Sequence, residues 1–106
     1  MDLRQLRYFV VLAEELHFRR AAERLNITQA PLSVAIQTLE RELGAPLFLR
    51  TQRKVVMTAI GAAFLEHSRV ILARVERSTA EMREIISGEA GELRIGFTAA
   101  SSLLSF

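Results

Sequence analysis

Residues 18–43, FRRAAERLNITQAPLSVAIQTLEREL, decide the fold of this chain. Apolar residues with helical spacing fill the first part of this stretch, stop at the polar break N-I-T, and resume after it. We therefore expect a helix at 18–25 and another at 28–43, whose first residue, a threonine, is the expected N-cap. The small pair Ala21 and Ala22 lets the second helix cross the first closely. This is the helix-turn-helix pattern, whose second helix fits a DNA major groove.

The segments on either side complete a winged arrangement. Residues 3–15 place apolar side chains three or four positions apart and are expected to form an amphipathic supporting helix. Gly44 ends the helix at 28–43, and Pro46 prevents its continuation. Residues 47–57 then carry apolar flanks around the polar centre TQRK, which is typical of a small hairpin. In this position the hairpin would be the wing of a winged helix-turn-helix.

A long helix is expected beyond the hairpin. Residues 59–88 contain no proline, end at Gly88, and carry paired apolar residues on a seven-residue period, as in helices that pair with another helix. About 30 residues at ~1.5 Å each give ~45 Å, longer than so small a domain could cover, although packing on its own domain is the alternative. We therefore expect a homodimer. The residues predicted to line its interface are Phe64, Leu65, Ser68, Ile71, Leu72, Val75, Met82 and Ile85.

The last segment, residues 89–106, has a different pattern. Every second residue from Leu93 to Phe97 is apolar, as in a β-strand, but no further strand follows with which it could pair. We interpret this segment as a hinge and the first strand of a domain that the chain lacks. The expected organisation is mainly α: a winged helix-turn-helix DNA-binding domain over 1–58, a linker or dimerisation helix over 59–88, and this final segment.

Composition limits the function. The chain has 106 residues, 50% of them hydrophobic, enough for one modest core. It has no cysteine, which excludes disulfides, zinc-thiolate sites and cysteine nucleophiles and suits a reducing cytoplasm. His17 and His67 are too isolated to bind a metal, and no phosphate-binding glycine loop occurs, so no metal or cofactor is expected. No apolar run approaches the ~20 residues of a membrane span, and no grouping of acid, base and nucleophile indicates an enzyme. A cytoplasmic protein is expected.

Charge is distributed unevenly around a net value of +2. Residues 1–57 hold nine Lys or Arg and six Asp or Glu, a balance of +3, whereas 58–106 hold five and six, a balance of −1. The basic excess therefore accompanies the helix-turn-helix and includes Arg19 and Arg20. Because phosphate-facing charge dominates affinity for nucleic acid, double-stranded DNA is the expected partner.

The order and spacing of many residues match a known family. The matching positions are Leu6, Phe9, Phe18, Ala21, Ala22, Leu25, the TQxxLS run at 28–33, Ile36, Leu39, Glu40, Leu43, Gly44, Leu47, Phe48, Arg50, Thr58 and Gly61. Over essentially its whole length, the chain resembles the LysR-type transcriptional regulators. The resemblance implies a winged helix-turn-helix, a linker helix that dimerises, and a C-terminal domain that binds a small-molecule effector. A tetramer of the intact protein is expected, although the sequence does not decide between a dimer and a tetramer.

The helix at 28–43 is expected to read DNA from one face. Leu32, Ile36, Leu39 and Leu43 share the opposite face, which would join the core. The residues predicted to contact DNA from this helix are Thr28, Gln29, Ala30, Pro31, Ser33, Val34 and Gln37. A glutamine can bond bidentately to adenine, and an exposed Val34 could meet a thymine methyl. The alternative is that Val34 is an ordinary exposed apolar residue, which is common.

The wing, about residues 47–57, is expected to contact the DNA backbone or the minor groove through Arg50, Arg53 and Lys54. Arg50 has a second interpretation, an ion pair with Glu40 beneath the wing. The alternative function is that of a module that only dimerises through its long helix and does not bind DNA. The basic wing favours DNA binding.

Overall fold

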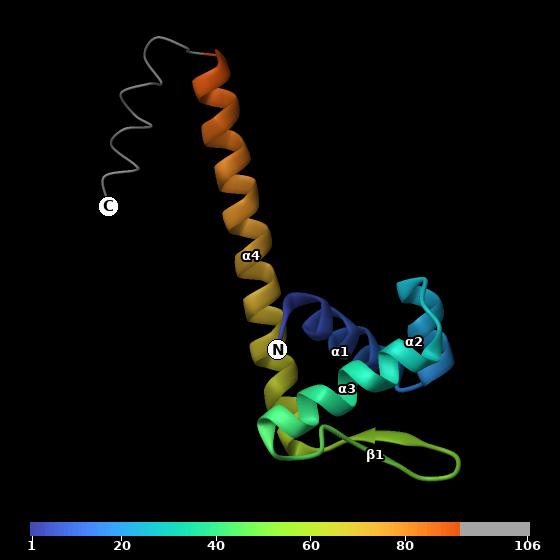
Figure 1. Cartoon of the computed structure of the whole chain (residues 1–106). Helices are drawn as coiled ribbons and strands as arrows, with labels where there is room; N and C mark the ends of the chain where they lie inside the picture. Colours follow the sequence, from blue (N-terminus) through green and yellow to red (C-terminus); the bar gives the residue numbers. More distant parts are fainter. Residues whose placement is uncertain (92–106) are drawn as a thin grey trace. The chain divides into compact units, whose positions relative to one another are not determined.

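A computed structural model describes the backbone of residues 1–91 and the side chains of residues 1–89 (Figure 1). The predicted strand from Leu93 to Phe97 lies outside the described residues. The elements are, in order, α1 (Leu3–Glu15), α2 (Phe18–Leu25), α3 (Gln29–Leu43), β1 (Phe48–Arg50), β2 (Val55–Met57) and α4 (Ala59–Gly91). The mainly helical fold with a two-stranded wing is confirmed. The chain divides into two compact units, residues 1–72 and 73–106.

The core of the first unit lies where α1, α2 and α3 meet (Figure 1). Phe9 of α1 is fully buried, and the small Ala21 and Ala22 of α2 are buried beside it, so α3 crosses α2 closely as predicted. The other buried apolar residues are Leu6, Leu12, Ala13, Leu32, Ala35, Ile36, Leu39, Leu47 and Phe48. Leu43 does not join them, contrary to the prediction. It is 40% exposed because it is the last residue of α3, beyond the turns that pack on the core.

The first three helices end in left-handed residues: Leu16 after α1, Asn26 after α2 and Gly44 after α3, with φ of 50°, 56° and 76°. Gly44 confirms the predicted end of α3, since glycine adopts this conformation at no steric cost. Thr28 occupies the N-cap of α3 as predicted, but its side chain makes no capping hydrogen bond.

β1 and β2 form an antiparallel hairpin in which Phe48 pairs with Met57. Residues 51–54 form its tip. The backbone N–H of Thr51 donates to the carbonyl of Lys54 (2.8 Å), and the N–H of Lys54 donates to Oγ1 of Thr51 (3.1 Å). The predicted hairpin and its polar tip are confirmed.

The joint between the hairpin and α4 is closely packed. Oγ1 of Thr58 donates to the carbonyl of Pro46 (2.7 Å) and accepts from the N–H of Gly61 (2.9 Å), which satisfies a donor in the first turn of α4. The N–H of Thr58 donates to the carbonyl of Leu47 (3.0 Å). A Cβ on Gly61 would overlap that carbonyl oxygen and lie 2.7 Å from Cγ of Met57. Only glycine fits this close approach.

The first turns of α4 belong to the core. The Phe64 ring lies 5.0 Å from the Phe9 ring, Leu65 packs against the buried cluster, and Ser68 is fully buried. Phe64, Leu65 and Ser68 were predicted to line the dimer interface, but they pack within their own chain, as the alternative stated. A seven-residue repeat shows which side chains share a face, but it does not show what covers that face.

α4 continues through Gly88, its predicted end, as far as Gly91. Ile71 and Met82 are 39% and 52% exposed, and the other predicted interface residues from this part of α4, Leu72, Val75 and Ile85, are half-buried. No helix within residues 1–91 is both long and apolar enough to cross a membrane.

Candidate nucleic-acid interface

The predicted base-contacting residues lie at the N-cap of α3 and on its solvent-exposed side. They are the exposed Thr28, Gln29, Ala30, Pro31, Val34 and Gln37 and the half-buried Ser33. Val34 is 59% exposed although it is apolar. The face therefore offers amide, hydroxyl and small apolar groups, which are the groups that discriminate base edges in a major groove.

A groove lies between the start of α2, the start of α3 and the hairpin tip. Its lining residues are Leu16, His17, Phe18, Arg19, Gln29, Arg50, Thr51, Gln52, Arg53, Lys54 and Val55. The groove brings Gln29, at the start of α3, together with the three cations predicted from the wing. Two regions that are separated in the sequence thus form one continuous surface.

This groove is rich in positive charge. Arg19, Arg50, Arg53 and Lys54 line it, and in the part of the chain that the structure describes none of them forms an ion pair with a carboxylate. Cations without a nearby acidic partner create a positive potential over a concave surface, and such a surface attracts phosphate.

Arg50 and Glu40 do not pair, so that interpretation of Arg50 is wrong. Cζ of Arg50 instead lies 3.9 Å from the centre of the Phe18 ring, a cation–π contact. Oε2 of Glu40 accepts from the backbone N–H groups of Leu47 (2.7 Å) and Phe48 (3.3 Å). Glu40 therefore connects α3 to the start of the hairpin, while Arg50 connects the hairpin to α2 and still lines the groove.

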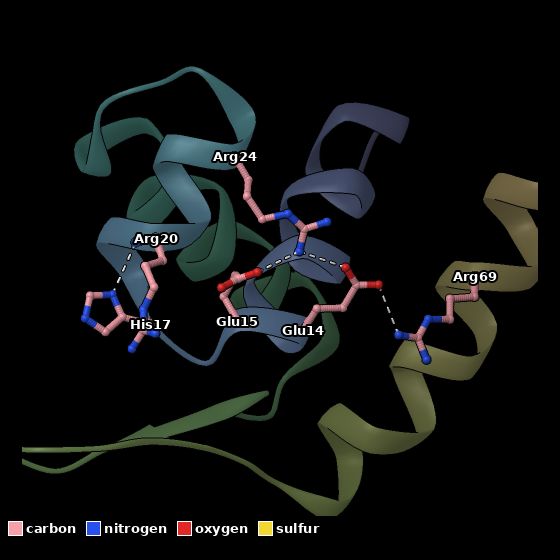
Figure 2. A network of polar contacts seen from close by, with 6 residues as sticks. All are labelled: Glu14, Glu15, His17, Arg20, Arg24 and Arg69. Carbon is pink, nitrogen blue, oxygen red and sulfur yellow. Dashed lines mark hydrogen bonds and ion pairs between the residues drawn. The ribbon is translucent and has the colours of Figure 1, made fainter.

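His17 has a local structural role at the edge of the groove. Its Nδ1 accepts from the backbone N–H of Arg20 (3.2 Å), which caps the N-terminus of α2 (Figure 2). Nδ1 can accept this bond only while it carries no proton. Among residues 1–91, no group of three or more His, Asp or Glu side chains is placed to hold a metal ion.

A network of ion pairs connects three helices of the first unit (Figure 2). Nη1 of Arg24 donates to Glu14 (2.9 Å) and to Glu15 (3.0 Å), and Nη2 of Arg69 donates to the other oxygen of Glu14 (3.2 Å). The hydrogen bond from Arg24 lowers the pKa of Glu14 below its ordinary value of 4.5, burial partly opposes this, and the bond from Arg69 lowers it further. The hydrogen bond to Glu14, and then the one to Glu15, raise the pKa of Arg24. This network braces α1 against α2 and the start of α4.

Several residues of the groove are not predicted as contacts by the sequence. Phe18 of α2 contacts Arg50 of the hairpin through its ring. No sequence pattern predicts a contact between two residues so far apart in the chain. Gln52 lies in the polar tip beside Arg53. Its place between two predicted contact positions, Arg50 and Arg53, is a signal that could have identified it.

Comparison with known proteins agrees with this geometry. The model of the bacterial regulatory helix-turn-helix protein, lysR family, matches residues 3–62. The uncharacterized HTH-type transcriptional regulator YnfL of Escherichia coli (strain K12) is 55% identical over 104 residues, which cover 98% of this chain and 35% of YnfL. The chain spans about a third of the length of such curated relatives.

Solved structures are similar to this chain over about four fifths of its length. The BenM_DBD/catB site 1 DNA complex matches with a TM-score of 0.79 and 42% identity, covering 82% of this chain and 98% of that chain. The CbnR_DBD-DNA complex matches with a TM-score of 0.76 and 42% identity, covering 78% and 95%.

Proposed function

This chain belongs to the lysR family of bacterial regulatory helix-turn-helix proteins, and from that membership we propose that it is the sequence-specific DNA-binding part of a transcriptional regulator. In this proposal α3 enters the major groove and reads base edges, while the hairpin tip contacts the backbone or the minor groove. Two structures similar to this chain are complexes with DNA, which supports the proposal.

One observation carries the proposal. The exposed face of α3 adjoins, at Gln29, a groove lined by Arg19, Arg50, Arg53 and Lys54, none of which has a carboxylate partner among residues 1–91. Base-reading groups and phosphate-binding charge are thus adjacent, as recognition of duplex DNA requires. A module that only dimerises would not need base-reading groups beside phosphate-binding charge.

Titration with duplex DNA at several salt concentrations tests the function. Each phosphate contact steepens the fall of affinity with salt, so Arg53→Ala should weaken binding to all sequences and reduce the slope by about one. Arg74→Ala is the matched control, since it removes the same charge from an exposed position of α4 that does not line the groove. The proposal fails if the chain binds no duplex, or if the two variants have the same salt dependence.

We further propose that the protein forms a homodimer through α4 and a tetramer when intact. Ile71, Met82 and Ile86 remain 39%, 52% and 58% exposed, which leaves apolar surface for a second copy. Ile71→Asp would bury an unpaired carboxylate and should sediment as a monomer. Ala73→Asp, outside the apolar repeat, should keep the dimer mass. An unchanged mass for Ile71→Asp would remove this part of α4 from the interface.

The remaining parts of the intact protein are also proposals. Residues 1–58 would be the DNA-binding domain, α4 the linker helix, and the residues after α4 the connection to a C-terminal domain through which a small-molecule effector acts. Deleting 92–106 should therefore leave the DNA affinity of this chain unchanged. Because bacterial chromosomal DNA lies in the cytoplasm, the regulator would work there. The proposed function needs neither a cofactor nor a catalytic step.

A further inference from the structure

Val34 is the most exposed large apolar residue of α3, at 59%. A single exposed valine is ordinary on a protein surface, so its exposure alone indicates nothing. The position of Val34 on the helix is more informative than its exposure. The buried residues of α3 lie between Leu32 and Leu39, and at 100° per residue Val34 lies on the opposite side of the helix. It is therefore at the centre of the face that would enter a major groove.

The neighbours of Val34 divide this face into two rows, each with a spacing of four residues. The polar row is Gln29, Ser33 and Gln37, and the second row is Ala30, Val34 and Thr38. Gln29 lines the cationic groove, so the polar row begins beside the hairpin. The second row runs along the other side of the same face.

The second row offers methyl groups because the hydroxyl of Thr38 is already engaged. Oγ1 of Thr38 donates to the backbone carbonyl of Val34 (2.8 Å) and accepts from Nη2 of Arg41 (3.3 Å). Both bonds stay within the helix. Ala30 and Val34 carry no polar side-chain atom, so this row has no free group with which to bond a base edge.

A major groove presents one apolar group to such a row, the 5-methyl of thymine. A polar base edge facing Val34 would lose water and gain no partner, which is costly. We infer that Val34 recognises a thymine methyl in each operator half-site and so determines specificity at that base pair. This inference depends on the proposed DNA binding and adds the chemical group that is read.

Deoxyuridine provides the test, because it pairs like thymine and lacks only the methyl. A binding duplex is first selected from a random pool with this chain, and its thymines are then replaced by deoxyuridine one at a time. At one thymine per half-site the wild type should lose about fourfold in affinity, the equivalent of one buried methyl group at about 0.8 kcal/mol and 1.4 kcal/mol per tenfold. Val34→Ala should lose much less at that position and as much as the wild type at every other.

Two control variants sharpen the result. Val34→Thr keeps one methyl in the same shape and should give an intermediate loss. Ile60→Ala shortens another exposed apolar side chain, 52% exposed on α4, and should keep the fourfold loss. If every replacement affects the wild type and Val34→Ala equally, the inference is overturned while DNA binding stands. If the wild type selects no duplex, the proposed function falls and this inference falls with it.

Discussion

Replacing Gly61 with alanine should destabilise the first unit strongly, although alanine is the better helix former. Gly61 lies in the first turn of α4, where an added Cβ would overlap the carbonyl oxygen of Leu47 and approach Cγ of Met57 to 2.7 Å. The carbonyl cannot easily withdraw, because it accepts a hydrogen bond from the N–H of Thr58 (3.0 Å). An outward shift of α4 would carry Thr58 with it, so the overlap and the loss of this hydrogen bond would both destabilise the fold.

The magnitude follows from three contributions. Overpacking costs about 1–3 kcal/mol, and the upper value applies because a backbone atom obstructs the new methyl group. Loss of the hydrogen bond from Thr58 adds about 1 kcal/mol. Helix propensity favours alanine over glycine by about 1 kcal/mol. The free energy of unfolding should therefore fall by about 3 kcal/mol, which corresponds to a drop of roughly 12–24 °C in the melting temperature of a small domain.

Thermal and urea unfolding followed by circular dichroism measures this effect. Gly88→Ala is the matched control, since it lies in the same helix and an added Cβ would meet nothing within 4 Å. That variant should be unchanged or more stable by about 0.5–1 kcal/mol, from helix propensity alone. If Gly61→Ala behaves like Gly88→Ala, α4 does not pack against the Leu47 carbonyl and the reasoning is refuted.

Three further substitutions test individual contacts. Glu40→Ala should lower the free energy of unfolding by about 2 kcal/mol, because it leaves the two backbone N–H groups at the start of the hairpin without their charged acceptor; a neutral result in urea unfolding would contradict this. Ser68→Ala should raise the melting temperature, since the buried Oγ has no hydrogen-bond partner among the described residues and its removal relieves about 1 kcal/mol; a lower melting temperature would reveal a partner. Glu14→Gln should cost only about 0.5 kcal/mol at pH 7, because the side chain is 35% exposed and its ion pairs are screened. Arg24, and then Arg69, hold the pKa of Glu14 below 4.5, so this contribution is present above pH 4.5 and is lost as the pH falls through the lowered pKa. Acid titration of the wild type and of Glu14→Gln should therefore show that their free energies of unfolding converge. A constant difference down to low pH would argue against the network.

The elements of the fold were predictable because their signals are local. Helical spacing of apolar residues indicated α1, α2 and α3, and the glycine after α3 marked its end. The apolar flanks around the polar centre 51–54 indicated the hairpin. The exposed face of α3 followed from the same periodicity, since the residues that pack inward determine which residues remain outside.

Contacts between elements were less predictable because sequence spacing does not select a partner. Glu40 was one proposed partner of Arg50, yet it accepts from backbone N–H groups and Arg50 stacks on Phe18. Phe64 and Ser68 fit a dimer repeat and yet pack within their own unit. Only the crossing of the helices in three dimensions determines which of these surfaces meet.

The two hydrogen bonds that Glu40 accepts affect which DNA sites this protein would bind. Because Glu40 ties the start of the hairpin to α3, we expect the hairpin to keep a constant separation from the proposed base-reading helix. Phosphates along a duplex are regularly spaced, with one per about 3.4 Å of helix axis on each strand. Two contacts at a constant separation therefore span a constant length of duplex. Operators for this protein should differ in the bases they present, but the number of base pairs between the bases read by α3 and the backbone touched by the hairpin should not vary.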